Sequence, residues 1–371
     1  MKSKLLGAWL AGTVAATPAY AQDATSNADQ GADAPQQAQP QAIIVTASKR
    51  SERLSDVPLA VTALGGDDLR QAGVVDTGDL ARVVPSFNVQ NSYYGNPVYY
   101  IRGVGFSDPT PTVAPAVSVY LDQVPLPYSI MARGAVLDLE RVEVLKGPQG
   151  TLFGQNSTGG AVNYIPARPG DVMEVGADIS YGRFNTVDAS AYVGGPITDT
   201  LGVRVAGQIQ SGDDWQFSTT RDDTRGQKKF LNGRIILAWE PSDTVNFELT
   251  AQAWHDGSDT PAPQYFFLAP QDPAGEQDAL DAYAAESPAP DNPRAANWDP
   301  NSPTKRDTNF YQIALRGGID LSDSVRLNSI TSYSNLDFFQ PFDLDGTAWT
   351  NLFSEETVRR QRQWHRFEVV I

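Results

Sequence analysis

Apolar and polar residues alternate along the chain from Asp171 onward. In the segment 174–181, for example, Val175, Ile179 and Tyr181 alternate with polar or small residues. The same period recurs in 187–193, 203–210, 231–239, 245–252 and 311–319, and less regularly in 325–335 and 358–371. Because successive side chains of a strand point to opposite faces, this pattern predicts about eight β-strands, each with one apolar and one polar face.

The connections between these strands are alternately short and long. GPITDTL, EPSDT and LSDS are tight turns, whereas 211–228, 256–306 and 338–356 are long, and only 182–185 is short where a long connection is expected. A soluble β-sandwich would show the same alternation of side chains, but alternating turns and loops are typical of a transmembrane β-barrel. An aromatic girdle at the membrane surface would then contain residues near strand ends: Tyr181, Trp239, Trp254 and Tyr333.

Residues 50–168 have the mixed pattern of a small α/β domain. Acidic N-termini predict two short helices, at 67–72 and 77–84. Strands are predicted at 98–102, 117–121 and 141–145. In the stretch Leu139–Pro169 the last of these strands leads into a glycine-rich segment and then into a further apolar strand, 161–165. The segment is not a P-loop, because no lysine follows its glycines, so these glycines predict backbone bends or close approaches.

The sequence ERVEVLKGPQGTLFG, followed by GGAVN, resembles the end of the plug domain of TonB-dependent outer-membrane receptors. The segments YYIRGVG and VYLDQVP resemble the same domain. Lys146 stands where arginine is usual, and Pro166-Ala167 replaces a more common Thr-Lys. Glu143 and Lys146 are expected to anchor the plug. The resemblance implies a structural role in the plug for Arg102, Gly103, Glu143, Lys146, Gly147, Gly150, Gly154, Gly159 and Gly160.

The N-terminus has the layout of a cleaved secretory signal peptide, with Lys2 and Lys4, an apolar run 5–16 and then Ala19-Tyr20-Ala21. Cleavage is expected after Ala21. The apolar run is too short for a transmembrane helix. Residues 22–42 contain no aromatic and no branched aliphatic residue, so we expect a disordered linker.

A short segment rich in β-branched residues follows the linker: Ile43, Ile44, Val45, Thr46 and Ala47. One interpretation is an ordinary first strand of the α/β domain. The other is a docking strand that adds to the sheet edge of a partner through main-chain hydrogen bonds. Its position resembles that of the TonB box, which implies contact with TonB.

Loops of the α/β domain at 91–97, 105–115 and 125–133 correspond to plug loops that face the outside and touch substrate in the family. By this resemblance, the candidate ligand-binding residues are Tyr93, Tyr94, Phe106, Asp108 and Tyr128. Packing against the barrel wall, or exposure to solvent, is the alternative role for each of them.

Composition excludes several classes of function. The net charge is −16 and no basic stripe is present, which argues against a nucleic-acid partner. There is no cysteine, and only His255 and His365 could supply an imidazole, so neither a disulfide framework nor a thiolate metal site is expected. The Gly-x-Ser-x-Gly motif is absent as well. We therefore predict no catalytic residue, no metal site and no cofactor.

Barrel geometry bears on how much of a receptor this chain represents. Eight strands would enclose a radius of about 8 Å, whereas a compact domain of about 120 residues needs roughly 17 Å, and about 22 strands would enclose it. We therefore expect an α/β plug followed by an incomplete antiparallel barrel, with about eight of an expected 22 or so strands. The expected order is signal peptide 1–21, linker 22–42, TonB box 43–47, plug 48–168 and truncated barrel 169–371.

The leading functional hypothesis is a TonB-dependent outer-membrane receptor that takes up a scarce, bulky nutrient, with no activity of its own as a fragment. The resemblance implies TonB, with ExbB and ExbD in the inner membrane, as partners. The other expected partners are outer-membrane lipid and an extracellular small molecule such as a ferric siderophore. The alternative is an outer-membrane or surface β protein that binds a ligand without transport. A periplasmic hydrolase is a third, weaker hypothesis, because the sequence shows no paired nucleophile and base.

Overall fold

The computed structural model describes residues 43–370, apart from positions 48, 51, 93–95, 107–113, 265–280, 282–284, 286–291, 323, 344–345 and 349–353. The predicted signal peptide and linker lie outside the described residues. None of the described helices combines the length and the apolar character needed to cross a membrane.

Residues 43–168, which we call the α/β domain, are built on a five-stranded sheet in the order β3-β8-β9-β6-β7. The central strands β8 (Leu139–Lys146), β9 (Gly160–Pro166) and β6 (Val117–Leu121) are largely buried. The edge strands are β3 (Val61–Gly65) and β7 (Val124–Leu126). Strands β6 and β9 run parallel, and the other neighbours run antiparallel. Strand β9 is buried at every position, which explains its largely apolar sequence; Asn163 is its one buried polar side chain.

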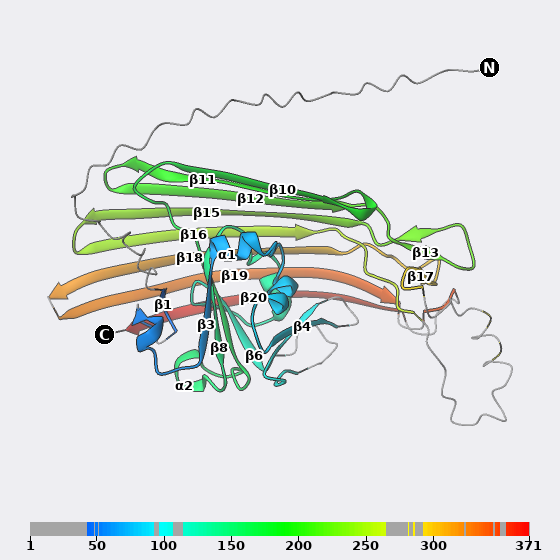
Figure 1. Ribbon diagram of the computed structural model, residues 1–371, viewed down its shortest axis with the longest axis horizontal. Helices are drawn as coiled ribbons and strands as arrows, with labels where there is room; N and C mark the ends of the chain where they lie inside the picture. The colour runs from blue at the N-terminus through cyan, green and yellow to red at the C-terminus, as the bar shows by residue number, and fades with distance from the viewer. Residues whose placement is uncertain are drawn as a thin grey trace, which may run out of the picture. The chain divides into compact units, whose positions relative to one another are not determined.

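Short helices and a hairpin surround this sheet (Figure 1). The helices are α1 (Gly66–Gln71), α2 (Gly150–Phe153) and the 3₁₀ segments η1 (Leu54–Asp56), η2 (Thr77–Arg82) and η3 (Ser129–Gly134). The hairpin consists of β4 (Phe87–Asn91) and β5 (Pro97–Ile101). The helix predicted at 77–84 is thus a 3₁₀ turn, and a reciprocal capping box between Asp76 and Asp79 fixes its start.

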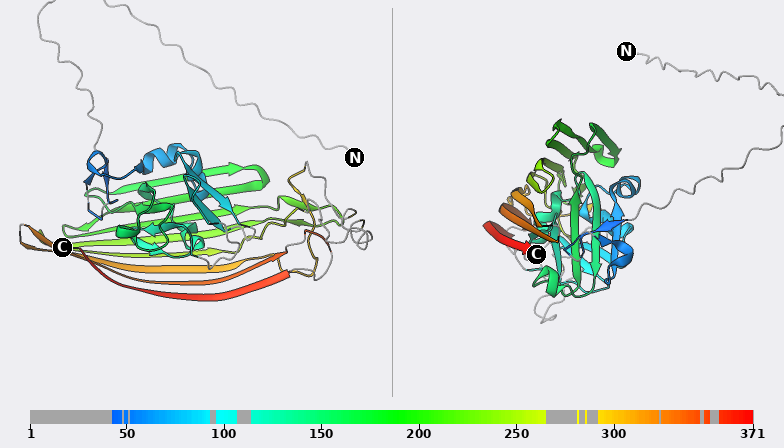
Figure 2. Two further views of the ribbon diagram at one scale, coloured as in Figure 1. Left: turned by 90° about the horizontal axis from the view of Figure 1, so that it is seen from below. Right: turned by 90° about the vertical axis from the view of Figure 1, so that its left-hand side faces the viewer.

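The second part of the chain forms an antiparallel sheet of eight strands, which we call the wall, as the period-two pattern predicts (Figure 1). Its order is β10 (Glu174–Gly182), β11 (Thr186–Thr198), β12 (Leu201–Gly212), β15 (Lys228–Ser242), β16 (Val245–Asp256), β18 (Asp307–Ser322), β19 (Val325–Asp343) and β20 (Ser354–Val370). The sheet curves around one side of the α/β domain (Figure 2).

Tight turns and long connections lie at opposite ends of the wall strands. The short connection predicted at 182–185 is confirmed as the 3₁₀ segment η4 (Arg183–Asn185). The long connections carry a small three-stranded sheet of β13 (Gln216–Ser218), β14 (Thr224–Arg225) and β17 (Ala295–Ala296).

The two faces of the wall have the opposite arrangement from that of a soluble sandwich. On the face toward the α/β domain, polar residues such as Arg234 and Gln252 are buried. On the other face, apolar residues such as Ile179 and Tyr181 are 79% and 71% exposed. A soluble sandwich buries its apolar face, whereas a transmembrane barrel turns its apolar face outward and keeps a polar interior. The structure therefore favours the barrel interpretation of the alternation.

One residue of the predicted aromatic girdle is placed differently. Trp254 is only 3% exposed, and it belongs to the core that the wall shares with the α/β domain. Its ring stacks on Phe310 at 5.5 Å, and its indole N–H donates to the carbonyl of Met131. The girdle prediction was wrong for Trp254, because this residue lies on the inward face of β16 and packs against η3.

Candidate functional site

The predicted docking segment, Ile43–Ala47, is folded onto the α/β domain. It contains strand β1 (Ile44–Val45), which pairs antiparallel with β2 (Glu52–Arg53). Ile44 is 43% exposed, whereas Val45 and Ala47 are buried in a small apolar cluster. Among the described residues, β1 has a strand neighbour on one side only. Val45 is completely buried and the Thr46 N–H is bonded to Glu143, so an incoming strand would pair with β1 only after the segment leaves the domain.

The carboxylate of Glu143 holds this segment in place. Glu143 lies on the central strand β8 and is completely buried. Its Oε1 accepts hydrogen bonds from the backbone N–H of Thr46 at 2.8 Å and from Nε of Arg141 at 2.8 Å. The Thr46 hydroxyl lies 3.1 Å from Oε2. A buried carboxylate with these charge-assisted bonds makes a strong attachment point, and it joins residues that are far apart in the sequence.

The docking segment lies at the end of the wall that carries the tight turns (Figure 1). The ammonium group of Lys49 stacks over the rings of Tyr120 and Phe153, which fixes the chain just after β1. A cavity of about 830 Å³ separates the segment from the wall. The wall residues that line it near the tight turns are Asn246, Ser324 and Arg326.

A buried ion network joins the α/β domain to the wall close to this cavity. Asp122 accepts from Arg168 at 2.9 Å and lies 2.9 Å from Nη2 of Arg316 on β18. Arg168 also donates to Glu248 on β16 at 2.6 Å. Burial alone would raise the pKa of Asp122, but the charges of Arg316 and Arg168 outweigh burial and hold that pKa below its ordinary value.

The described contacts of Glu143 and Lys146, which we expected to anchor the plug, lie within the α/β domain, and their anchoring role stays a prediction. Glu143 bonds to Thr46 and Arg141 within the α/β domain, and Lys146 ends β8 with its backbone N–H donating to Ala60. Among the described residues, the ion pairs that join the domain to the wall come from Arg133, Asp122, Asp138 and Arg168. Sequence reasoning missed these, because no local pattern sets them apart from other surface charges.

Backbone geometry explains several of the other residues assigned to the plug structure. Arg102 and Gly103 form a tight turn with φ of +52° and +78°. Gly160 has φ of +140°, and a Cβ there would lie 2.2 Å from the carbonyl oxygen of Leu145. A Cβ on Gly159 would lie 2.9 Å from the carbonyl oxygen of Val104. Gly147 and Gly154 have φ of +99° and +74°, with open space around the Cβ position. Gly150 also has open space but no positive φ, so its backbone does not require glycine.

The structure describes two of the five candidate ligand-binding residues, Phe106 and Tyr128. Tyr93, Tyr94 and Asp108 lie outside the described residues. Phe106 is 54% exposed, and Tyr128 is half-buried against the main core, just before η3. Among the described residues, neither Phe106 nor Tyr128 lines the cavities of about 340 and 830 Å³ between the domain and the wall, and their role in binding stays a prediction.

A second cavity of about 340 Å³ lies at the end of the wall with the long connections. The sequence did not single out its lining, which includes Asp76, Arg133, Phe184, Trp215, Lys228 and Arg306. Arg133 and Arg306 both pair with Asp256, at 3.0 and 3.2 Å. Burial and the nearby charge of Arg133 lower the pKa of Arg306 to about 10, so its guanidinium stays charged at neutral pH. Charged and aromatic side chains of this kind suit a polar or anionic ligand.

In the part of the chain that the structure describes, no group of three or more His, Cys, Asp or Glu residues is arranged to hold a metal ion.

Comparisons with known proteins agree with this architecture. Residues 53–161 match the family model described as TonB-dependent Receptor Plug Domain. The chain is 32% identical over 208 residues to the pesticin receptor of Yersinia pestis, a match that covers 54% of this chain and 30% of the relative. It is 27% identical over 165 residues to the ferric-pyoverdine M114 receptor PbuA of Pseudomonas sp. (strain M114), covering 43% and 19%. The chain spans less than a third of the length of these curated relatives.

Solved structures show the same fold. The ferric yersiniabactin uptake receptor FyuA from Yersinia pestis superposes with a TM-score of 0.62 at 22% identity, over 77% of this chain and 42% of that chain. The ferripyoverdine receptor of the outer membrane of Pseudomonas aeruginosa gives 0.63 at 16% identity, over 85% and 39%. Residues 53–161 thus match the plug domain of TonB-dependent receptors, and the eight-stranded antiparallel sheet that follows has the fold of part of the barrel wall of such receptors.

Proposed function

We propose that this chain is part of an outer-membrane receptor that takes up a ferric siderophore in a TonB-dependent manner. The observation that carries the proposal is the position of β1, which pairs with a single strand among the described residues and is bonded through Thr46 to Glu143 on the central strand of the α/β domain. Two named relatives, the ferric-pyoverdine receptor and the ferric yersiniabactin receptor, support an iron complex as the ligand.

In this proposal, the exposed apolar face of the wall contacts outer-membrane lipid, after cleavage of a signal peptide near Ala21. TonB, energised through ExbB and ExbD, adds a strand to β1 and pulls on it. The pull reaches β8 directly, because Thr46 bonds to Glu143 across 97 positions of sequence. The protein makes and breaks no covalent bond, so it acts as a transporter and not as an enzyme.

The test is uptake of radioactive iron by a Gram-negative strain that lacks its own siderophore receptors and produces this receptor. The probes are ferric yersiniabactin, ferric pyoverdine and a ferric catecholate. We expect uptake of at least one complex, and we expect it to stop when TonB is deleted. Binding without uptake would favour the alternative, a surface protein that binds a ligand without transport. If no probe is bound and no probe is taken up, iron transport is contradicted.

A further inference from the structure

The connections 211–228 and 256–306 of the wall pack against each other around the small sheet of β13, β14 and β17. Strand β13 pairs parallel with β17, so that the two connections share a sheet. Asn297 is completely buried, and its Oδ1 accepts from the Ser218 hydroxyl and from the backbone N–H of Thr219, at 2.9 and 3.0 Å. Buried polar contacts therefore join the two connections.

Arg294, which lies just before β17, joins three connections. Its Nε donates to the carbonyl of Trp215 at 2.8 Å. Its guanidinium carbon lies 4.8 Å from the ring centre of Phe184 in η4 and 5.5 Å from that of Phe217 in β13, at distances typical of cation–π contacts. Its own carbonyl accepts from the backbone N–H of Phe217 at 3.0 Å. One half-buried arginine thus holds the short connection 182–185 and both long connections together.

Phe184 and Trp215 are the two aromatic residues among those that line the cavity of about 340 Å³. Phe184 has φ of +61°, a left-handed conformation that costs free energy in a residue other than glycine, so neighbouring contacts must hold it. One of these contacts is the backbone N–H of Asp213, which donates to the Phe184 carbonyl at 2.8 Å. The Trp215 indole packs directly on Gly226, where an added Cβ would lie 2.4 Å from Cδ1. The place of each ring thus depends on contacts made by the connections.

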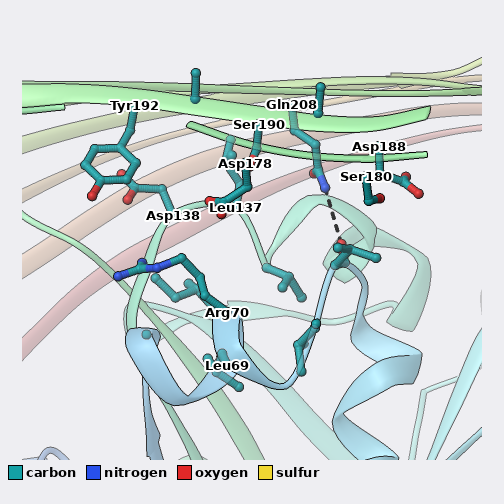
Figure 3. Close-up of a pocket in the computed structure, with 18 of the residues that line it drawn as sticks. Leu69, Arg70, Leu137, Asp138, Asp178, Ser180, Asp188, Ser190, Tyr192 and Gln208 are labelled. Atoms are coloured by element: carbon teal, nitrogen blue, oxygen red, sulfur yellow. Dashed lines mark hydrogen bonds between the residues drawn. The ribbon is translucent and has the colours of Figure 1, made fainter. Parts of the chain in front are cut away.

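The cavity beside α1 offers no comparable aromatic side (Figure 3). This cavity, of about 250 Å³, is lined by residues of α1 and of β10, β11 and β12, and Tyr192 is the one aromatic residue among the described residues that line it. The guanidinium carbon of Arg204 already covers the Tyr192 ring at 4.3 Å. A hydrogen bond from Nε2 of Gln208 to the carbonyl of Val75 at 3.3 Å crosses the cavity. Of these two cavities, the one lined by Phe184 and Trp215 therefore offers aromatic contacts to a ligand.

We infer that Arg294 is a positioning residue for ligand binding, because it holds Phe184 and Trp215 at the cavity before a ligand arrives. This inference rests on the proposed transport function. Rings that are already fixed lose little conformational freedom when a ligand packs on them, so this preorganisation raises affinity. Arg133 and Arg306 line the same cavity. The site thus suits a ligand that combines aromatic rings with polar or anionic groups.

Iron uptake measured over a range of concentrations separates positioning from a general loss of function. The variant is Arg294→Met, which removes the hydrogen-bond donors and the charge, and the probes are ferric yersiniabactin, ferric pyoverdine and a ferric catecholate. We expect the half-saturating concentration to rise about tenfold, with the maximal rate and the amount of receptor at the cell surface unchanged. Arg294→Lys keeps the charge beside the rings but lacks the planar fork of donors, so it should recover part of the affinity.

Arg221→Met is the matched control. Arg221 donates to the carbonyl of Trp298 at 2.7 Å, and its guanidinium carbon lies 4.9 Å from the centre of that ring. Among the described residues that line the 340 Å³ cavity, neither Arg221 nor Trp298 is present. We expect Arg221→Met to keep the half-saturating concentration of the unsubstituted receptor. An equal rise in the two methionine variants would show a general loosening of the connections and would overturn the positioning role.

Hydrogen exchange of the ligand-free receptor provides a measurement that needs no ligand. The reporter is the backbone N–H of Asp213, which bonds to the Phe184 carbonyl. We expect exchange here to be several-fold faster in Arg294→Met than in the unsubstituted receptor or in Arg221→Met. Unchanged exchange in Arg294→Met, or faster exchange with an unchanged half-saturating concentration, would overturn the inference. If the unsubstituted receptor takes up no probe, the transport function is overturned instead, and the exchange result still decides whether Arg294 positions Phe184.

Discussion

Arg204 on β12 and Asp138 in the α/β domain form a two-point ion pair. Nε of Arg204 lies 2.7 Å from one carboxylate oxygen of Asp138, and Nη2 lies 2.8 Å from the other. Both side chains are about 5% exposed. This planar, bidentate geometry is specific to arginine and gives the attachment both strength and direction.

Loss of the ion pair between Arg204 and Asp138 should lower the stability of the folded protein. Arg204→Met leaves the Asp138 carboxylate buried without its partner, so we expect the free energy of unfolding to fall by about 3 kcal/mol. Urea unfolding in lipid vesicles, followed by tryptophan fluorescence, measures the change. Glu174→Gln is the control: Glu174 also bonds to Arg204 but is half exposed, and its loss should cost less than about 1 kcal/mol. Equal losses of unfolding free energy in the two variants would contradict the conclusion that the buried pair of Arg204 with Asp138 is the stronger attachment.

Acid should release the ion network around Asp122. The pKa of this carboxyl is lowered in the folded protein, because Arg316 and Arg168 outweigh its burial. Its contribution to stability is therefore fully present above its ordinary pKa of about 3.9 and is lost as the pH falls through the lower folded value. We expect Asp122→Asn to reduce stability at neutral pH and to flatten the fall in urea midpoint below about pH 4. Asparagine tolerates the φ of +49° at this position, so the substitution removes the charge without straining the backbone.

The Glu143 carboxylate should control how tightly the docking segment is held. Glu143→Gln removes the negative charge that Thr46 and Arg141 share, so local opening of 43–47 should become easier by about 1.5–3 kcal/mol. Hydrogen exchange measured by mass spectrometry should show faster exchange at the Thr46 amide. Ser118→Ala, at another buried polar position of the domain, is the control and should leave exchange in 43–47 unchanged. Unchanged exchange in Glu143→Gln would contradict the role of the carboxylate.

The glycines of the segment after β8 should differ in their tolerance of alanine. At Gly160 an added Cβ would meet the carbonyl oxygen of Leu145 at 2.2 Å, and φ is +140°. We expect Gly160→Ala to cost about 2–4 kcal/mol. Gly150 begins α2 and has no atom within 4 Å of the Cβ position, so Gly150→Ala should be neutral or slightly stabilising. Thermal unfolding of the two variants checks this difference.

The sequence predicted the strands better than their surroundings. The period of two located the wall strands, because alternation follows directly from the geometry of a β-strand. It could not decide what each face contacts, so Trp254 was assigned to the membrane surface although it packs against Phe310 and Met131. The short-turn and long-loop pattern, which depends only on lengths, was the more reliable guide to the barrel.

The candidate site depends on contacts that sequence spacing does not reveal. Thr46 and Glu143 are 97 positions apart in the sequence, and the ion-paired residues Asp138 and Arg204 are 66 positions apart. The motif resemblance identified the docking segment and Glu143 separately, but only the fold brings them together. It also shows that the domain is attached to the wall through Asp122, Asp138 and Arg168, which no local pattern marks.

The most direct test of the account is a crosslink between the docking strand and TonB. Ile44→Cys is the position of choice, because Ile44 is exposed and Val45 is buried. In cells that are taking up a ferric siderophore, oxidation should join this cysteine to a cysteine in the C-terminal domain of TonB. Leu152→Cys, a similarly exposed position on α2, should give no adduct. Iron uptake through the Ile44→Cys receptor without any adduct to TonB would contradict the account.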